Sequence, residues 1–320
     1  MTVDVPPQRT VVRALRFVPE AERVAFTPDA PQAPPANRIV VAIGLVLAVA
    51  LVWVVAGITG PIMAGTSALG LALGFTLLHS RFGFTSGWRQ LAAVGQGAAV
   101  RAHMLMLATA TILFSVLLAG GFSLAGTPKP SVAAVGIPLL VGAFLFGIGM
   151  QVGGSCASGT LFAVGSGQTA VVLTLFGFIV GSVLAALTFT FWTVTVPAGT
   201  PVSLAETFGF PGALGLSLLV MATIVAITYV VARRRTPPPV ERPPSARGIA
   251  RVLRGSWPMW VGAIVLAVLN AGVLFVSGGA WGVTSAFGLW GGKVLSGLGV
   301  DVASWAYFQV PANAKALQGS

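Results

Sequence analysis

The amino-acid sequence predicts an all-α integral membrane protein, a polytopic helical bundle with inverted-topology repeats and broken, re-entrant helices that meet near the bilayer midplane. Three observations lead to this fold class: an apolar composition, a series of helix-length apolar segments, and a short motif that recurs in both halves. Apolar residues make up 56% of the 320 residues and charged residues 8%, whereas soluble domains contain roughly 25% charged residues. The mean hydropathy of +0.92 therefore indicates a membrane protein.

The apolar segments predict the transmembrane helices. A bilayer span needs about 20 mostly apolar residues in helical form. The formal net charge of +11 does not indicate nucleic-acid binding, because the basic residues lie between the apolar segments, where membrane orientation alone places them. Seven spans are expected, at 41–59, 62–79, 104–121, 133–150, 169–191, 211–232 and 257–277.

The distribution of arginine predicts the topology. Residues 1–38 are rich in arginine and proline and are expected to form a disordered cytoplasmic tail. Residues 233–256 contain seven arginines and many prolines, which predicts a basic cytoplasmic linker. Residues 192–210 contain no lysine or arginine and are expected to form an outer loop. Six spans separate the tail from the linker, and an even number places both on the same side.

A short motif repeats along the chain. The sequence FGFTSG at Phe82–Gly87 recurs as WGVTSA at Trp281–Ala286, and each copy follows an apolar segment. The first membrane repeat, 39–191, contains five spans, so the second repeat, 211–320, begins from the opposite side of the bilayer. An odd number of spans in each repeat is what inverted topology requires.

The only cysteine lies in a break between apolar segments. Cys156 belongs to the run GIGMQVGGSCASGTLF at 147–162, which is rich in glycine and serine. A helix that restarts after such a break directs free N–H groups and a positive dipole end into the gap, which suits an anion. We therefore expect the breaks at 82–87 and 153–159 to meet near the bilayer midplane, with Phe84 close to Cys156. The alternative is close helix packing through the glycines, with the cysteine as a small hydrophobe.

The run around Cys156 closely resembles the glycine–cysteine motif of the YeeE/YedE-like sulfur transport family, whose best-known members take up thiosulfate. RFGFTSGWRQ at 81–90 resembles that family's other signature, and WGVTSAFGLWGGK at 281–293 resembles the start of its second half. The resemblance implies a multi-pass transporter in the bacterial inner membrane, with a small sulfur anion as its substrate, and the arginine distribution places its N-terminus in the cytoplasm. It also implies that Cys156 lies in the central permeation path, where thiols of that family contact the substrate sulfur.

Two departures from the family pattern limit what the resemblance implies. Members often carry a cysteine in the first signature, where this chain has Phe84, so a relay that uses such a cysteine is absent or altered here. Cys156 lies 72 residues after Phe84, and the same distance after Val283 falls beyond Ser320. We therefore expect the second repeat to be incomplete and the chain to be a fragment of a longer protein.

The residues of the breaks are the candidates for contact with the substrate. A neutral thiol can donate a weak S–H hydrogen bond to the substrate sulfur, and hydroxyl groups can contact its oxygens. For each hydroxyl, capping of a restarted helix is an equally good interpretation. Arg81 and Arg89, with His79, Arg101 and His103, lie at the predicted inner mouth, where they either orient the protein or attract anions. The predicted substrate path comprises Cys156, Gly153, Gly154, Ser155, Ser158, Gly159, Gly83, Phe84, Thr85, Ser86, Thr284 and Ser285.

The sequence leaves two other classes of function open. One is a membrane-embedded thiol enzyme that uses Cys156 as a nucleophile, although no histidine or acid lies near it in the sequence. The other is a sulfur-transfer subunit that acts with soluble sulfur-carrier proteins on the cytoplasmic side. We expect transport rather than catalysis, with no cofactor and no metal, in contact with the lipid bilayer and without nucleic acid.

Overall fold

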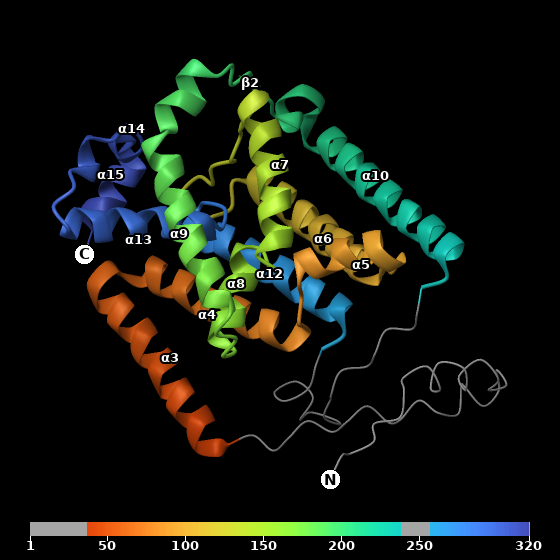
Figure 1. Cartoon of the computed structure of the whole chain (residues 1–320), viewed down its shortest axis with the longest axis horizontal. Coiled ribbons are helices and arrows are strands. Elements are labelled where there is room, and N and C mark those ends of the chain that lie inside the picture. The colour runs from red at the N-terminus through yellow and green to blue at the C-terminus, as the bar shows by residue number, and fades with distance from the viewer. Residues whose placement is uncertain (1–36, 238–256, 320) are drawn as a thin grey trace, which may run out of the picture. The chain divides into compact units, whose positions relative to one another are not determined.

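The computed structural model describes residues 37–237 and 257–319, and almost all regular structure in them is helical (Figure 1). The predicted tail falls almost entirely outside the described residues, as does most of the predicted linker. A single two-stranded antiparallel pairing, β1 (Ala134–Val135) with β2 (Thr200–Pro201), joins two loops. The main helices are α3 (Arg38–Thr59), α4 (Pro61–Ser80), α5 (Phe84–Val94), α6 (Ala98–Gly120), α7 (Ile137–Val152), α8 (Ala157–Gly165), α9 (Val171–Leu187), α10 (Leu204–Arg235), α12 (Met259–Ser277) and α13 (Val283–Gly297).

The predicted spans coincide with helices, which confirms an all-α, polytopic membrane protein. Six helical segments of the described chain are long and apolar enough to cross a membrane, and two of them combine a long helix with the short one that follows a break. The predicted span 169–191 is the shorter apolar helix α9, and a turn of π-helix, Phe191–Thr195, follows it. The span 211–232 lies within α10, whose helical geometry is interrupted at Gly209, two residues before Pro211.

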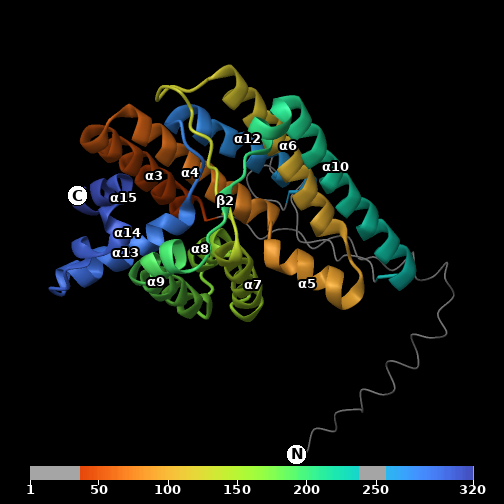
Figure 2. The same cartoon turned by 90° about the horizontal axis from the view of Figure 1, so that it is seen from above.

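The two helices that precede the repeated motif pack against each other in opposite directions (Figures 1 and 2). The start of α4 lies against the end of α12, and the end of α4 lies against the start of α12. Such an antiparallel relation between equivalent helices is what an inverted-topology repeat requires. Four contacts define the direction: Gly65 with Val276, Leu69 with Gly272, Ser80 with Gly262, and the Trp257 N–H, which donates to the carbonyl of His79 at 2.8 Å.

A buried apolar cluster holds α4, α6 and α12 together. Leu73 of α4, Ala102 of α6, and Leu266 and Val273 of α12 are all buried in it, together with Phe82 from the first motif. The corresponding aromatic residue of the second motif, Trp281, lies against Gly70 of α4, 3.2 Å from where a β-carbon would stand. Each motif thus begins with an aromatic ring, but Phe82 is buried in the cluster whereas Trp281 is exposed.

Three contacts between segments that are distant in the sequence agree with the predicted topology. On the predicted outer side, the Lys129 N–H donates to Gly278 O at 2.9 Å, and β1 pairs with β2. On the predicted inner side, the Arg235 guanidinium donates to Ala92 O at 2.8 Å. Each of these contacts joins two points that the predicted topology assigns to one side of the bilayer.

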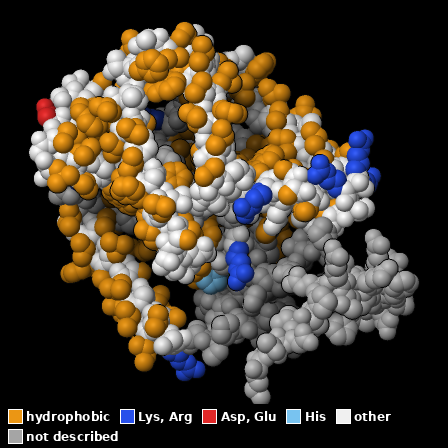
Figure 3. Space-filling view, viewed as in Figure 1, with side chains coloured by type: hydrophobic (Ala, Val, Ile, Leu, Met, Phe, Trp, Pro, Cys, Tyr) orange, Lys and Arg blue, Asp and Glu red, His pale blue; other side chains and the backbone are white. Residues whose placement is uncertain are grey.

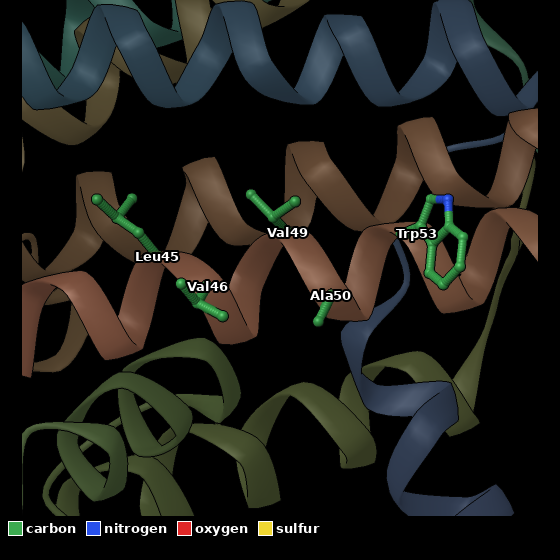
Figure 4. Close-up of a pocket in the computed structure, with 5 residues that line it drawn as sticks. All are labelled: Leu45, Val46, Val49, Ala50 and Trp53. Atoms are coloured by element: carbon green, nitrogen blue, oxygen red, sulfur yellow. The ribbon is translucent and has the colours of Figure 1, made fainter.

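Apolar side chains, orange in Figure 3, cover a large part of the face drawn there, and basic side chains appear on it in a few places. Helix α3 is the extreme case, because none of its side chains is buried. Leu45, Val46, Val49, Ala50 and Trp53 line a shallow apolar hollow along one face of α3 (Figure 4). A helix with so much exposed apolar surface is stable when lipid covers it.

Candidate functional site

The cysteine run forms a break between two helices. Helix α7 ends at Val152, Gly154 has a φ of 76°, and α8 begins at Ala157. Glycine permits this left-handed conformation, which redirects the chain between the helices. Cys156 is the N-cap residue of α8, with extended backbone angles, and its side chain accepts no capping hydrogen bond from a backbone N–H of the first turn. The opening N–H groups of α8 have no partner within the helix, so they and the helix dipole remain directed into the break.

Local hydrogen bonds determine the shape of this break. The Ser155 and Thr160 hydroxyls are 2.7 Å apart. The hydroxyl of Thr174, a residue of α9, donates to Gly153 O at a distance of 3.2 Å. The thiol of Cys156 is partly buried and lies 3.5 Å from the Ser158 hydroxyl. A β-carbon at Gly159 would stand 3.3 Å from the Cys156 sulfur. Glycine at this position therefore leaves space beside the thiol.

The two copies of the repeated motif form equivalent breaks. Gly83 precedes α5 and Gly282 precedes α13. The Ser86 hydroxyl donates to Gly83 O at 3.0 Å, and the Ser285 hydroxyl donates to Gly282 O at 2.6 Å. Both hydroxyl protons are therefore engaged by backbone carbonyls, which favours a bracing role for these two serines over donation to a substrate.

The remaining hydroxyl candidates of these breaks differ in environment. Thr284 is exposed, whereas Thr85 is buried, and its hydroxyl has no hydrogen-bond partner among the described residues. A buried hydroxyl without a protein partner is uncommon, and such a group is able to bind a ligand or an ordered water. Unlike the hydroxyls of Ser86 and Ser285, the Thr85 hydroxyl is therefore not engaged by a described protein group.

Helix packing links the three breaks. Helix α8 packs against α4 and α13, and α5 packs against α7. The ring of Phe84 lies 5.1 Å from His103 and 6.2 Å from Trp88, measured between ring centroids. Direct proximity of Phe84 to Cys156 stays a prediction, as does the role of every residue in the predicted path.

The basic residues of the predicted inner mouth fall into two groups. Arg81 and Arg89 are exposed. Arg101 instead lies between α6 and α10, where it donates to the Thr228 hydroxyl at 3.4 Å and lies 4.4 Å from the Tyr229 ring centroid. His103 is 1% exposed, so the expectation that it lies at the mouth is wrong.

The reason for this error is that α6 begins at Ala98, six residues before the predicted start of the span. The signal that identifies His103 is the run HMLMLATATILF, in which a histidine opens an uninterrupted apolar helix. An ionisable residue inside a span indicates function more often than orientation.

No metal site is evident in residues 37–237 and 257–319, where no three His, Cys, Asp or Glu side chains gather. The cysteine break, 153–159, contains no charged residue. The two acidic residues in the described part of the chain, Glu206 and Asp301, lie in other segments. The break can therefore offer an anion N–H groups, hydroxyls, a thiol and a helix dipole.

Comparison with known proteins yields two matches. Residues 79–320 match the model of a family described as "Sulphur transport". Over 211 residues the chain is 26% identical to the thiosulfate transporter TsuA of Escherichia coli strain K12, with 62% of this chain and 56% of TsuA covered. The chain therefore spans little more than half the length of that relative. Both matches are to transport proteins, which agrees with the expected transport function and not with an enzyme.

Proposed function

Because the chain belongs to the sulphur transport family, we propose that it imports a small sulfur-containing anion, with thiosulfate as the substrate, across the bacterial inner membrane. The observation that carries this proposal is the break at Gly153–Cys156, which places a partly buried thiol at the start of α8. The name of the related transporter, which specifies thiosulfate, supports the choice of substrate.

The chemistry of the break suits passage of a dianion rather than tight binding. A lysine or arginine at mid-membrane is costly and would hold a doubly charged anion strongly. Backbone N–H groups and the α8 dipole give weaker attraction from several points. The Cys156 thiol adds a soft contact that a substrate sulfur matches better than an oxygen does.

The enzyme alternative has less support. A nucleophilic thiol needs a base within hydrogen-bond reach. The hydrogen-bond neighbour of Cys156 within the described residues is Ser158, which is not a base. No observation favours a particular soluble sulfur carrier, so that partner has no place in the proposal.

Transport is tested by reconstitution. Purified protein in liposomes should take up ³⁵S-thiosulfate at a rate at least about tenfold above empty liposomes, and excess sulfate should compete poorly because it lacks the terminal sulfur. Growth on thiosulfate as sole sulfur source, in a host without its own importers, provides the cellular check. Uptake no faster than in empty liposomes would contradict the proposal, and equal competition by sulfate would remove the role of the sulfur contact.

The proposal includes an orientation with α5 and the α10–α12 connection on the cytoplasmic side, because Arg81 follows α4, Arg89 lies in α5 and seven arginines lie between 233 and 256. In a Cys156→Ala background, a cysteine at Lys129 should react with a membrane-impermeant maleimide in intact cells. A cysteine at Arg234 should react only after the membrane is permeabilised. Labelling of position 234 from outside, with no labelling at 129, would reverse the orientation.

A further inference from the structure

His103 lies at the junction of α5 and α6, beside the first break. Its ring centroid is 4.4 Å from that of Phe82 and 5.1 Å from that of Phe84, and its Cε1 is 3.3 Å from where a β-carbon at Gly87 would stand. The imidazole thus contacts three residues of the motif FGFTSG. Its position is tied to the break that the proposed function assigns to the substrate path.

The two ring nitrogens of His103 have different environments. Nδ1 lies 2.7 Å from the carbonyl oxygen of Ala99, and because a carbonyl only accepts, Nδ1 carries the hydrogen. Nε2 is buried and has no hydrogen-bond partner among the described residues. In the neutral ring this atom is a free acceptor. Burial of an unpaired acceptor is unfavourable, so packing alone would be better served by an apolar side chain.

Two further polar atoms of the same junction are buried without a partner in the described chain: Thr85 Oγ1 and Trp88 Nε1. Both belong to α5, and the Trp88 ring lies 6.2 Å from the Phe84 ring that His103 also contacts. The indole N–H can only donate, and the hydroxyl can donate, so both suit the oxygens of an anion. One helix pair therefore holds a free acceptor for a proton and two free donors for an anion.

The charged and titratable groups on the helices packed against α6 do not offer His103 a carboxylate. On α6 itself, Arg101 is directed to α10, where it contacts Thr228 and Tyr229. Helix α5 carries the exposed Arg89, and α12 carries no charged residue. Helix α10 carries Glu206 in its first turn and Arg233–Arg235 in its last. Within the part of the chain that the structure describes, none of these helices provides a carboxylate beside an imidazolium, and a bound anion would supply that negative charge.

We propose that Nε2 of His103 takes up a proton together with the transported anion, so that the protein is an anion–proton symporter. This inference rests on the proposed function. A proton from the outer solution adds to the Nε2 lone pair and gives an imidazolium with both nitrogens protonated, beside the bound dianion. On release, the anion and the proton both pass to the cytoplasm and the neutral ring is restored. The charge moved per cycle falls from two negative charges to one, which reduces the opposition of an inside-negative membrane potential.

Proteoliposomes that contain a pH-sensitive dye test this proposal. Addition of ³⁵S-thiosulfate outside should acidify the interior in step with uptake, and an imposed inward proton gradient should accelerate uptake severalfold. His103→Gln should abolish both the acidification and the acceleration. His79→Gln, a change at the other histidine of the chain, is the matched control and should retain both. Thiosulfate uptake without acidification in the unaltered protein, or acidification that persists in His103→Gln, would overturn symport and leave transport intact.

A second measurement leaves residue 103 unchanged. In the His79→Gln protein, ¹⁵N-histidine labels only His103, and solid-state NMR in bilayers reports the protonation of both ring nitrogens. Saturating thiosulfate at constant pH should convert the spectrum toward the imidazolium form, while bound ³⁵S is counted in the same sample. Bound thiosulfate with an unchanged neutral ring would refute the inference alone. Absence of any binding would instead refute the proposed function, and the inference with it.

Discussion

Replacing Cys156 with alanine is expected to reduce the initial rate of thiosulfate uptake at least about tenfold while leaving the protein folded in the membrane. The thiol is the one soft, polarizable group at the start of α8, and alanine removes both the sulfur and its weak donor. Because the Cys156 side chain makes no capping hydrogen bond to α8, its loss should not weaken that helix. Cys156→Ser keeps a donor but replaces sulfur by oxygen, and uptake should fall by a similar factor.

The matched control for this experiment lies at the other end of the same helix. Ser166 follows α8, and its hydroxyl donates to Ala163 O at 2.8 Å. Ser166→Ala also removes one polar atom, from an exposed side chain far from the break, so uptake should stay within about twofold of the unaltered protein. If Cys156→Ala transports at the unaltered rate, the cysteine is a packing residue and the break does not work through sulfur.

The second large effect is expected on stability, at the contact between the loops before α7 and before α10. Gly199 has a φ of 76°, and an added β-carbon would overlap the carbonyl oxygen of Val135. Gly199→Val therefore combines a left-handed conformation that valine adopts poorly with a collision against backbone, which cannot rotate away. We expect a loss of about 2–4 kcal/mol in the free energy of unfolding and a fall of at least about 5 °C in the melting temperature in detergent.

Gly142→Val supplies the comparison for Gly199→Val. Gly142 lies in α7, just beyond β1, and a β-carbon there would meet nothing within 4 Å. The same change of side chain at this open position should shift the melting temperature by less than about 2 °C. Equal shifts for the two variants would show that the pairing of β1 with β2 does not contribute to the stability of the fold.

The helices were predictable from the sequence because burial in lipid leaves a long apolar pattern. Each of the seven expected spans overlaps a helix, and the break before Ala157 falls where glycine and serine accumulate. The pairing of Ala134–Val135 with Thr200–Pro201 was not predictable, because two-residue strands have no alternation to detect and the contact joins distant loops.

The site was predictable only in part, for a reason that the hydroxyl groups illustrate. Ser86 and Ser285 occupy equivalent motif positions, and the sequence alone leaves open whether each contacts a substrate or braces its break. Their hydrogen bonds to Gly83 and Gly282 favour bracing. His103 was expected at the mouth because the predicted span begins at residue 104, whereas α6 begins at Ala98 and includes His103. Local composition identifies a break, but the environment of one side chain depends on helices that are distant in the sequence.

The packing of α12 against both α4 and α6 has a consequence for biosynthesis. Roughly 140 residues separate the end of α6 from the start of α12, so a ribosome at about 5–20 residues per second needs roughly 7–28 s to produce them. During that interval the faces of α4 and α6 that later contact α12 must meet lipid or the insertion machinery. Ser80, which contacts Gly262 of α12 in the complete structure, is among the residues that lack their α12 partner during this interval. A ribosome that stalls between these helices would therefore leave in the membrane a partly made protein that membrane-protein quality control can recognise.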